Sequence, residues 1–263
     1  MSSELNLDKA KVRRSFAAAA DSYDGLADLQ RRVGLELLRR FPLERRQGAL
    51  VDLGCGTGFL THQVASIIGG RQLIAVDIAL PMLLASRRKY PDMPASYLCA
   101  DAENLPFVKH GIAGIYSNLA LQWARDLPAA FAGFKRVLQA DSQLVFAIFG
   151  PETLRELKAA WAMVDDFVHV NTFHAADDLE HFLRAAGFSD IRLERRLYQP
   201  AYPSVRALMR ELKGIGAHNV NRGRNPKLTT RAQLQKMVSQ YQEQMTGRDI
   251  IASYEIIFVR ARS

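Results

Sequence analysis

The clearest candidates for chemistry are the residues of a glycine-rich run near position 52. An acid stands two residues ahead of three alternating glycines in Val51-Asp52-Leu53-Gly54-Cys55-Gly56-Thr57-Gly58. Glycines let a backbone approach a ligand closely, and a strand that feeds such a turn before a helix is typical of nucleotide-binding sites. The run therefore predicts a binding site for a nucleotide-like cofactor.

The spacing of the glycines separates two such cofactors. The dinucleotide pattern G-x-G-x-x-G/A would place its third small residue at position 59, where this chain has Phe59. A carboxylate at Asp52 would also repel a pyrophosphate, whereas the ammonium and sulfonium groups of S-adenosylmethionine tolerate it. We therefore predict S-adenosyl-L-methionine as the cofactor.

Two more acids follow expected strands farther along the chain. Asp77 stands 19 residues beyond Gly58, where a carboxylate can accept both ribose hydroxyls, and Asp101 is placed to meet the adenine amino group. The carboxyl edge of an open α/β sheet is where ligands bind, so the residues after the fourth expected strand would neighbour the methionine moiety. The predicted cofactor site comprises Asp52, Gly54, Cys55, Gly56, Gly58, Asp77, Ile78, Met82, Asp101, Ala102, Asn118 and Leu119.

A strand–helix rhythm positions these residues. We expect strands at 50–53, 73–76, 96–99, 112–116, 144–149, 191–197 and 254–260, and helices at 8–41, 59–68, 81–89, 127–137, 152–163 and 176–186. The alternation predicts an α/β fold with a Rossmann-like seven-stranded sheet and helices on both faces. Residues 1–45 would form an N-terminal helical lid segment ahead of a domain at 46–263. The excursion at about 198–252 would be a helical insertion between the last two strands, serving as a cap or partner-docking element.

Composition bounds the remaining classes. The chain has 263 residues, of which 48% are hydrophobic, enough for one large domain with a buried core. It shows neither an apolar run of membrane-spanning length nor a signal-like start. Its two cysteines are too few for a disulfide framework, and its histidines are not accompanied by other metal-ligating residues at a suitable spacing. We expect a cytoplasmic protein without a metal site.

The net charge of +8 is unevenly distributed. Residues 192–236 contain eleven Lys and Arg against two Glu, a balance of +9, while the remaining residues sum to about zero. A solvated surface and a docking face for an acidic partner both explain this concentration, and the sequence leaves the two open.

Several further stretches carry motifs. They are Phe16–Asp24 with Ala27–Gln30, then Ser117–Trp123, then Thr153–Leu157, and finally Leu212–Asn219 leading to Arg222, Arg224 and Leu228-Thr229. Over about residues 48–150 the glycine turn and its acids resemble class I methyltransferases. With these stretches, nearly the whole chain resembles the malonyl-acyl carrier protein O-methyltransferases of biotin synthesis (BioC). Lys213–Ala217 is the most specific piece.

This resemblance implies methyl transfer from S-adenosylmethionine to the free carboxyl of malonyl-acyl carrier protein, an acidic protein partner. A carboxylate is ionised at neutral pH and needs no general base, only donors that orient it. Tyr23 and Lys213 are our candidates for that catalytic role. For the substrate or the carrier protein, the candidates are Arg155, His218, Arg222 and Arg224.

Three other functions remain open at this point. A small-molecule carboxyl methyltransferase, such as one acting on trans-aconitate, would share the first 150 residues but not need the basic insertion. A nucleic-acid methyltransferase usually shows an N-P-P-Y-like motif where this chain has Ser117–Ala120, so we expect no nucleic-acid partner. A non-transferase assembly or hydroxylating factor of the complex I type keeps a similar fold, although the acids among the first eight residues argue against a transit segment.

Overall fold

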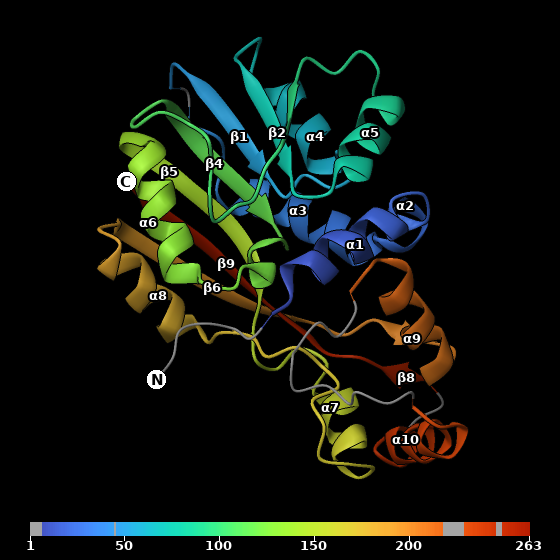
Figure 1. Ribbon diagram of the computed structural model, residues 1–263. Helices are drawn as coiled ribbons and strands as arrows, with labels where there is room; N and C mark the ends of the chain where they lie inside the picture. The colour runs from blue at the N-terminus through green and yellow to red at the C-terminus, as the bar shows by residue number, and fades with distance from the viewer. Residues whose placement is uncertain (1–6, 45, 218–228, 246–248) are drawn as a thin grey trace.

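The computed structural model describes residues 7–44, 46–217, 229–245 and 249–263 of the chain. Its centre is a seven-stranded sheet of order β3-β2-β1-β4-β5-β9-β6 (Figure 1). The strands are β1 (Ala49–Leu53), β2 (Leu73–Asp77), β3 (Ser96–Cys99), β4 (Ile112–Asn118), β5 (Leu138–Phe149), β6 (Ser189–Tyr198) and β9 (Tyr254–Arg262). All seven predicted strands are present.

The first five strands run parallel, and β9 enters antiparallel between β5 and β6. The order of strands reverses at β1: β2 and β3 follow on one side of it, and β4 and β5 on the other. Because these strands are parallel, the carboxyl ends of β1, β2 and β4 lie at one edge. Such a reversal opens a crevice at the carboxyl edge of the sheet. The predicted Rossmann-like fold class is confirmed.

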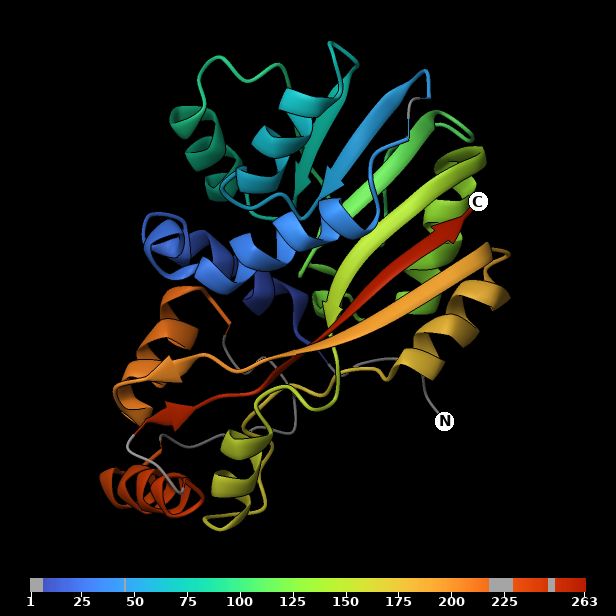
Figure 2. The ribbon, with the colours of Figure 1, turned by 180° about the vertical axis from the view of Figure 1, so that it is seen from behind.

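Helices cover both faces of the sheet. On one face lie α6 (Leu127–Val137) and α8 (Ala176–Ala185), and on the other lie α3 (Asp28–Arg40), α4 (Phe59–Ile67) and α5 (Leu80–Lys89) (Figures 1 and 2). Adjacent residues of β1 serve opposite faces: Val51 packs in the core cluster of α6, and Leu50 packs with α4. This two-sided burial explains why the central strands read as continuous apolar runs.

The N-terminal segment forms three helices rather than the single helix expected at 8–41. They are α1 (Lys9–Ala19), α2 (Tyr23–Leu26) and α3. Helix α3 belongs to the core, since Val33 and Leu37 are fully buried, while α1 and α2 cross the strand ends. No proline breaks the helical pattern. Tertiary contacts of Asp24 with Thr57 and Lys89 accompany the break.

The insertion contains helices, as predicted, and also a small two-stranded sheet. Its elements are β7 (Ala201–Tyr202), α9 (Val205–Gly214), α10 (Arg231–Glu243) and β8 (Ile250–Ile251), which pack near α7 (Arg155–Ala162). The end of α9 closes on the N-terminal helices: a Cβ on Gly214 would lie 2.1 Å from Leu26, and one on Gly216 would lie 3.0 Å from the Ser15 carbonyl. Among the described residues, no helix is long and apolar enough to cross a membrane.

Candidate active site

A cavity of about 780 Å³ is lined by residues from the carboxyl ends of β1, β2 and β4 and by residues of α1 and α2. It is lined by Lys9, Val12, Phe16, Tyr23, Leu53, Gly54, Gly56, Asp77, Ile78, Met82, Ala100, Asp101, Ala102, Asn118, Leu119, Ala120, Leu121, Trp123 and Ala124. We call it the cofactor cavity.

Most residues predicted for the cofactor site meet in this cavity. Nine of the twelve line it: Gly54, Gly56, Asp77, Ile78, Met82, Asp101, Ala102, Asn118 and Leu119. Asp52 and Cys55 instead line a smaller cavity of about 430 Å³ behind the glycine turn, which shares Gly54, Gly56 and Asn118 with the first. Gly58 lines neither cavity.

The glycines of the turn are needed for different reasons. Gly58 begins α4 with φ +84°, and a Cβ there would lie 2.0 Å from Ser86 Oγ on α5. Helix packing therefore requires that glycine, and its contact with the cofactor stays a prediction. At Gly56, with φ +52°, the nearest atom to a Cβ is Tyr23 Cε1 at 4.0 Å. The space that a side chain at position 56 would occupy is therefore part of the cofactor cavity.

Asp77 shapes the turn as well as the cavity. Its carboxylate accepts the backbone N–H of Gly56 at 2.9 Å and of Ala79 at 2.8 Å. Each carboxylate oxygen can accept a second hydrogen bond, so both remain able to bind ribose hydroxyls. Burial raises the pKa of Asp77, against the lowering effect of these amides.

Asp101 has an ion-pair partner that the sequence analysis missed. Lys9 of α1 pairs with both Asp101 and Glu103. The other Asp101 oxygen accepts the Glu103 N–H at 3.0 Å. Lys9 thereby fastens α1 across the cavity and contacts the acid that we predicted for the adenine amino group.

Tyr23 stands over the glycine turn at the start of α2. Burial, together with the negative charges of Asp77 and Asp24, raises the pKa of the Tyr23 phenol. The phenol therefore stays protonated and can donate a hydrogen bond into the cavity. The neighbouring Asp24 carboxylate accepts the Thr57 hydroxyl at 2.7 Å and pairs with Lys89 at 2.7 Å, which anchors α2 to the turn.

The smaller cavity is lined by several hydrogen-bond acceptors. Asp52 accepts the Thr61 hydroxyl at 2.6 Å, and burial raises the pKa of Asp52 to about 7, with that hydrogen bond lowering it and Asp77 raising it. Gln30 Oε1 and Asn118 Oδ1 are buried without a hydrogen-bond partner among the described residues. All three residues line this cavity, and an ammonium group is the type of donor that such acceptors bind. The residues present therefore fit the amino acid end of S-adenosylmethionine.

A second, larger cavity of about 1420 Å³ adjoins the cofactor cavity at Trp123, which lines both. Its walls come mainly from α3, α7, α9 and the loop 169–173. Lys213 lines this second cavity and not the first. Trp123 also packs edge-on against Phe16, with 5.3 Å between ring centroids, and is not among the residues predicted for the site.

Comparisons with known proteins agree with this geometry. Residues 51–146 match the model of a family described as a methyltransferase domain. The malonyl-[acyl-carrier protein] O-methyltransferase of Methylococcus capsulatus is 39% identical over 95% of this chain and 92% of its own, and that of Gallionella capsiferriformans is 35% identical over 98% and 92%. The chain belongs to this methyltransferase family. It is also 40% identical to the biotin biosynthesis bifunctional protein BioHC of Cellvibrio japonicus, of which it spans half the length.

Solved structures share the fold of this methyltransferase. YcgJ of Bacillus subtilis superposes with a TM-score of 0.64 at 13% identity over 88% of this chain and 97% of its own. Phosphoethanolamine N-methyltransferase 2 of Haemonchus contortus, in complex with S-adenosyl-L-methionine, gives 0.57 at 17% identity over 93% and 56%. Because the chain belongs to a methyltransferase family and its cofactor cavity is built from the predicted residues, S-adenosyl-L-methionine is the cofactor, as predicted.

The substrate candidates are dispersed in the methyltransferase. Arg155 is exposed, pairs with Glu152 and Glu156, and lines neither the cofactor cavity nor the second cavity. His218, Arg222 and Arg224 lie outside the described residues. Lys9, Asp24 and Trp123 are the site residues that sequence reasoning missed. The motifs Phe16–Asp24 and Ser117–Trp123 already contained two of them.

We predict that Asp77→Ala weakens cofactor binding by about 1.5–3 kcal/mol, the scale of hydrogen bonds to a charged group. Loss of the ribose contacts and a looser Gly56 amide contribute together. Titration calorimetry on the pure methyltransferase measures the change, and thermal unfolding verifies the fold. Unchanged affinity in a folded variant would remove Asp77 from the site.

The affinity for the cofactor is expected to depend on pH. Because burial holds the pKa of free Asp52 near 7, binding a cation beside it must favour loss of its proton. Cofactor affinity should therefore rise by up to about tenfold per pH unit from pH 5 to 7 and then level off. The folded-state pKa lies above that of the unfolded chain, so stability without cofactor should fall over the same rise in pH. Asp52→Asn should abolish both trends, and calorimetry in two buffers would detect the released proton.

Proposed function

We propose that this methyltransferase transfers a methyl group from S-adenosyl-L-methionine to the free carboxyl of malonyl-acyl carrier protein, and does so in the cytoplasm. The observation that carries the proposal is the pair of cavities that adjoin at Trp123. One fits the cofactor, and the other offers an apolar chamber to the long arm that carries the acyl group. Relatives named for this reaction, 35–39% identical over most of the chain, support it.

The chemistry asks for orientation rather than acid–base catalysis. S-adenosylmethionine supplies a methyl carbon that accepts a lone pair of the carboxylate oxygen, while the carbon–sulfur electron pair stays on sulfur. The products are a methyl ester and a neutral thioether, and no proton moves. Holding the two reactants in line can contribute about 7–11 kcal/mol in favourable cases. The protonated Tyr23 phenol is suited to direct the carboxylate, because it can donate but not remove a proton.

Charge supports a protein substrate, although the proposed docking face is narrower than residues 192–236. Three cations of that stretch, all on β6, pair with acids: Arg192 with Asp190, Arg195 with Glu255 and Arg196 with Glu36. On α9, Arg206, Arg210 and Lys213 are exposed and have no ion-pair partner among the described residues. Spacings of four and three residues put them on one helix face.

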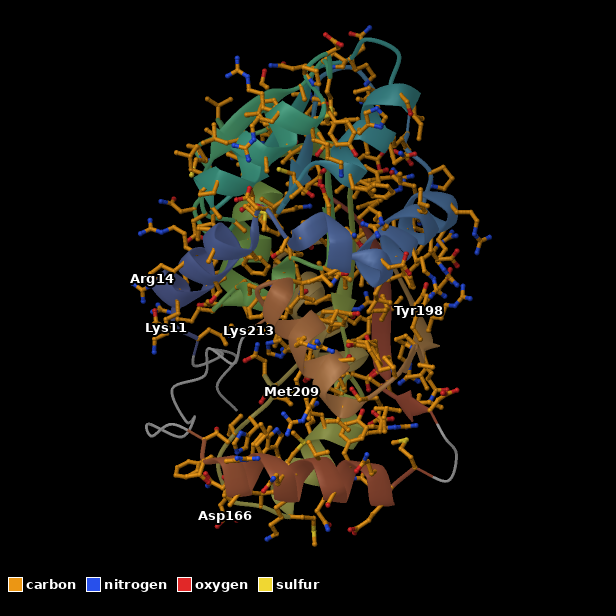
Figure 3. All side chains as sticks on the ribbon, turned by 90° about the vertical axis from the view of Figure 1, so that its right-hand side faces the viewer. Lys11, Arg14, Asp166, Tyr198, Met209 and Lys213 are labelled. Carbon is orange, nitrogen blue, oxygen red and sulfur yellow. The ribbon has the colours of Figure 1, made fainter. Side chains whose placement is uncertain are left out.

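We call Arg206, Arg210 and Lys213 the basic stripe, and propose it as the docking site for the acidic carrier protein. Figure 3 shows Lys213 on the same side of the molecule as Lys11 and Arg14 of α1. Arg210 and Lys213 also line the second cavity, so a carrier protein bound there would stand at its mouth.

The decisive experiment follows isotopically labelled methyl from S-adenosylmethionine to malonyl-carrier protein, with malonyl-coenzyme A and trans-aconitate as competitors. We expect a base-labile ester on the carrier-bound malonyl group. Labelling of trans-aconitate with none on the carrier protein would favour a small-molecule carboxyl methyltransferase. Absence of label in every acceptor would favour the non-transferase alternative.

The turnover number should depend little on pH between 6 and 8 at saturating cofactor. The acceptor carboxylate is already ionised throughout that range, and the Tyr23 phenol remains protonated. Initial rates at saturating substrate would test this. A steep loss of turnover between pH 8 and 6, in a protein that stays folded, would count against a carboxylate acceptor.

A further inference from the structure

The second cavity has a composition that suits a neutral chain rather than an ion. Apolar side chains dominate its walls, among them Leu29, Leu154, Leu157, Trp161, Met209 and Leu234. Its charged residues come from α9: Glu211 in the wall, with Arg210 and Lys213 exposed beside it. Burying an unpaired ion among apolar walls is costly, so a ligand inside should be uncharged over most of its length.

Glu211 gives the wall a specific polar group. The Tyr202 hydroxyl donates to Glu211 Oε1 at 2.7 Å, and the Tyr254 hydroxyl lies 3.2 Å from that of Tyr202. Burial raises the pKa of Glu211. Glu211 Oε2 has no hydrogen-bond partner within the part of the chain that the structure describes. The wall therefore offers an acceptor to an N–H donor and opposes a second carboxylate.

We propose that this cavity holds the pantetheine arm of the substrate, with Glu211 accepting an amide N–H of the arm; this proposal rests on the proposed function. The free carboxylate of the malonyl group enters the cofactor cavity past Trp123. The neutral amide chain follows along the apolar walls. The phosphate at its far end meets Arg210 and Lys213, which are exposed and line the cavity.

The chain carries its own reporters for this cavity. It has only two tryptophans, Trp123 and Trp161, and both line the second cavity. Indole fluorescence therefore responds to a ligand in this cavity; Trp161 does not line the cofactor cavity, whereas Trp123 lines both. S-methylpantetheine, which has the arm but neither malonyl group nor phosphate, is the binding probe, and S-methyl-N-acetylcysteamine is the truncated comparison.

The test variant is Glu211→Gln, which keeps the side-chain volume and an oxygen for the Tyr202 hydroxyl but can present an N–H donor to the cavity. The matched control is Glu180→Gln on α8, whose carboxylate pairs with Arg184. We expect S-methylpantetheine to change the fluorescence of the native protein saturably. Its dissociation constant should be about tenfold higher in Glu211→Gln and unchanged in the control.

Steady-state kinetics test the proposal independently of ligand binding. For malonyl-pantetheine, Glu211→Gln should raise the Michaelis constant about tenfold, while for the ethanethiol thioester of malonate it should leave the constant unchanged. An equal rise for both thioesters, or no saturable fluorescence change in a protein that methylates malonyl-pantetheine, would overturn the proposal. If no thioester is methylated but S-methylpantetheine still binds in a Glu211-dependent way, the proposed function fails while the arm site stands.

Discussion

Replacing Gly56 by valine is expected to weaken S-adenosylmethionine binding by about 100-fold or more. The missing side chain of Gly56 faces the cofactor cavity, with only Tyr23 Cε1 within 4.0 Å of a Cβ, so valine would fill ligand space. Overpacking a filled site costs roughly 1–3 kcal/mol, and the loss of close backbone approach adds to that cost. Titration calorimetry would measure the change.

Backbone strain needs a separate control, because Gly56 has φ +52° and a β-branched residue rarely adopts such angles. Gly69→Val provides it. Gly69 has φ +60°, and nothing lies within 4 Å of its Cβ position. The control should lose stability but keep its affinity for the cofactor. If the two variants bound the cofactor equally well, Gly56 would not border the ligand.

Reversing two charges of the basic stripe should raise the Michaelis constant for malonyl-carrier protein by about tenfold or more at low salt. In Arg206→Glu with Arg210→Glu, the helix presents two acids to an acidic partner. Rim charges act mainly on the encounter rate, and like charges facing each other cost affinity. The constant for malonyl-pantetheine should change much less, because that substrate has neither the protein partner nor the phosphate that Arg210 would meet. Steady-state kinetics with both substrates would show the difference.

The matched control reverses Arg87 and Arg88 on α5, which packs on β2 and β3 at the opposite edge of the sheet from β6. It changes net charge equally and should leave both constants unaltered. Added salt should erase the effect on the stripe, since the Debye length falls from about 30 Å at 0.01 M to about 10 Å at 0.1 M. If the Michaelis constant of the stripe variant for malonyl-carrier protein were unchanged at low salt, the basic stripe would be a solvated surface and not a docking site.

The cofactor turn could be predicted because its determinants are local. A buried strand, glycines at fixed spacing and a following helix are all read from one short segment, and Gly54 and Gly56 line the cofactor cavity. Gly58 shows the limit of that reasoning. A side chain at position 58 would collide with Ser86, which lies 28 positions farther along the chain. The spacing of glycines alone therefore could not distinguish a glycine needed for helix packing from one needed for ligand binding.

The basic stretch shows the same limit for charge. Composition located +9 within residues 192–236, but it could not tell which cations lack partners. Arg196 is paired with Glu36, 160 residues away, whereas Arg206 and Arg210 have no ion-pair partner among the described residues. Ion pairing between distant segments depends on which elements the fold brings together, and no local pattern encodes it.

The sequence by itself determined the fold class, the cofactor and the family-like motifs, because periodicity, glycine spacing and short motifs are properties of contiguous chain. The tertiary structure alone decided that α3 is core rather than lid, that Lys9 pairs with Asp101, and that Trp123 separates two cavities. Each of these depends on the packing of segments far apart in the chain. Contacts between distant segments form only when the helices and strands pack around a common core, whereas the spacing of residues is already present in the sequence.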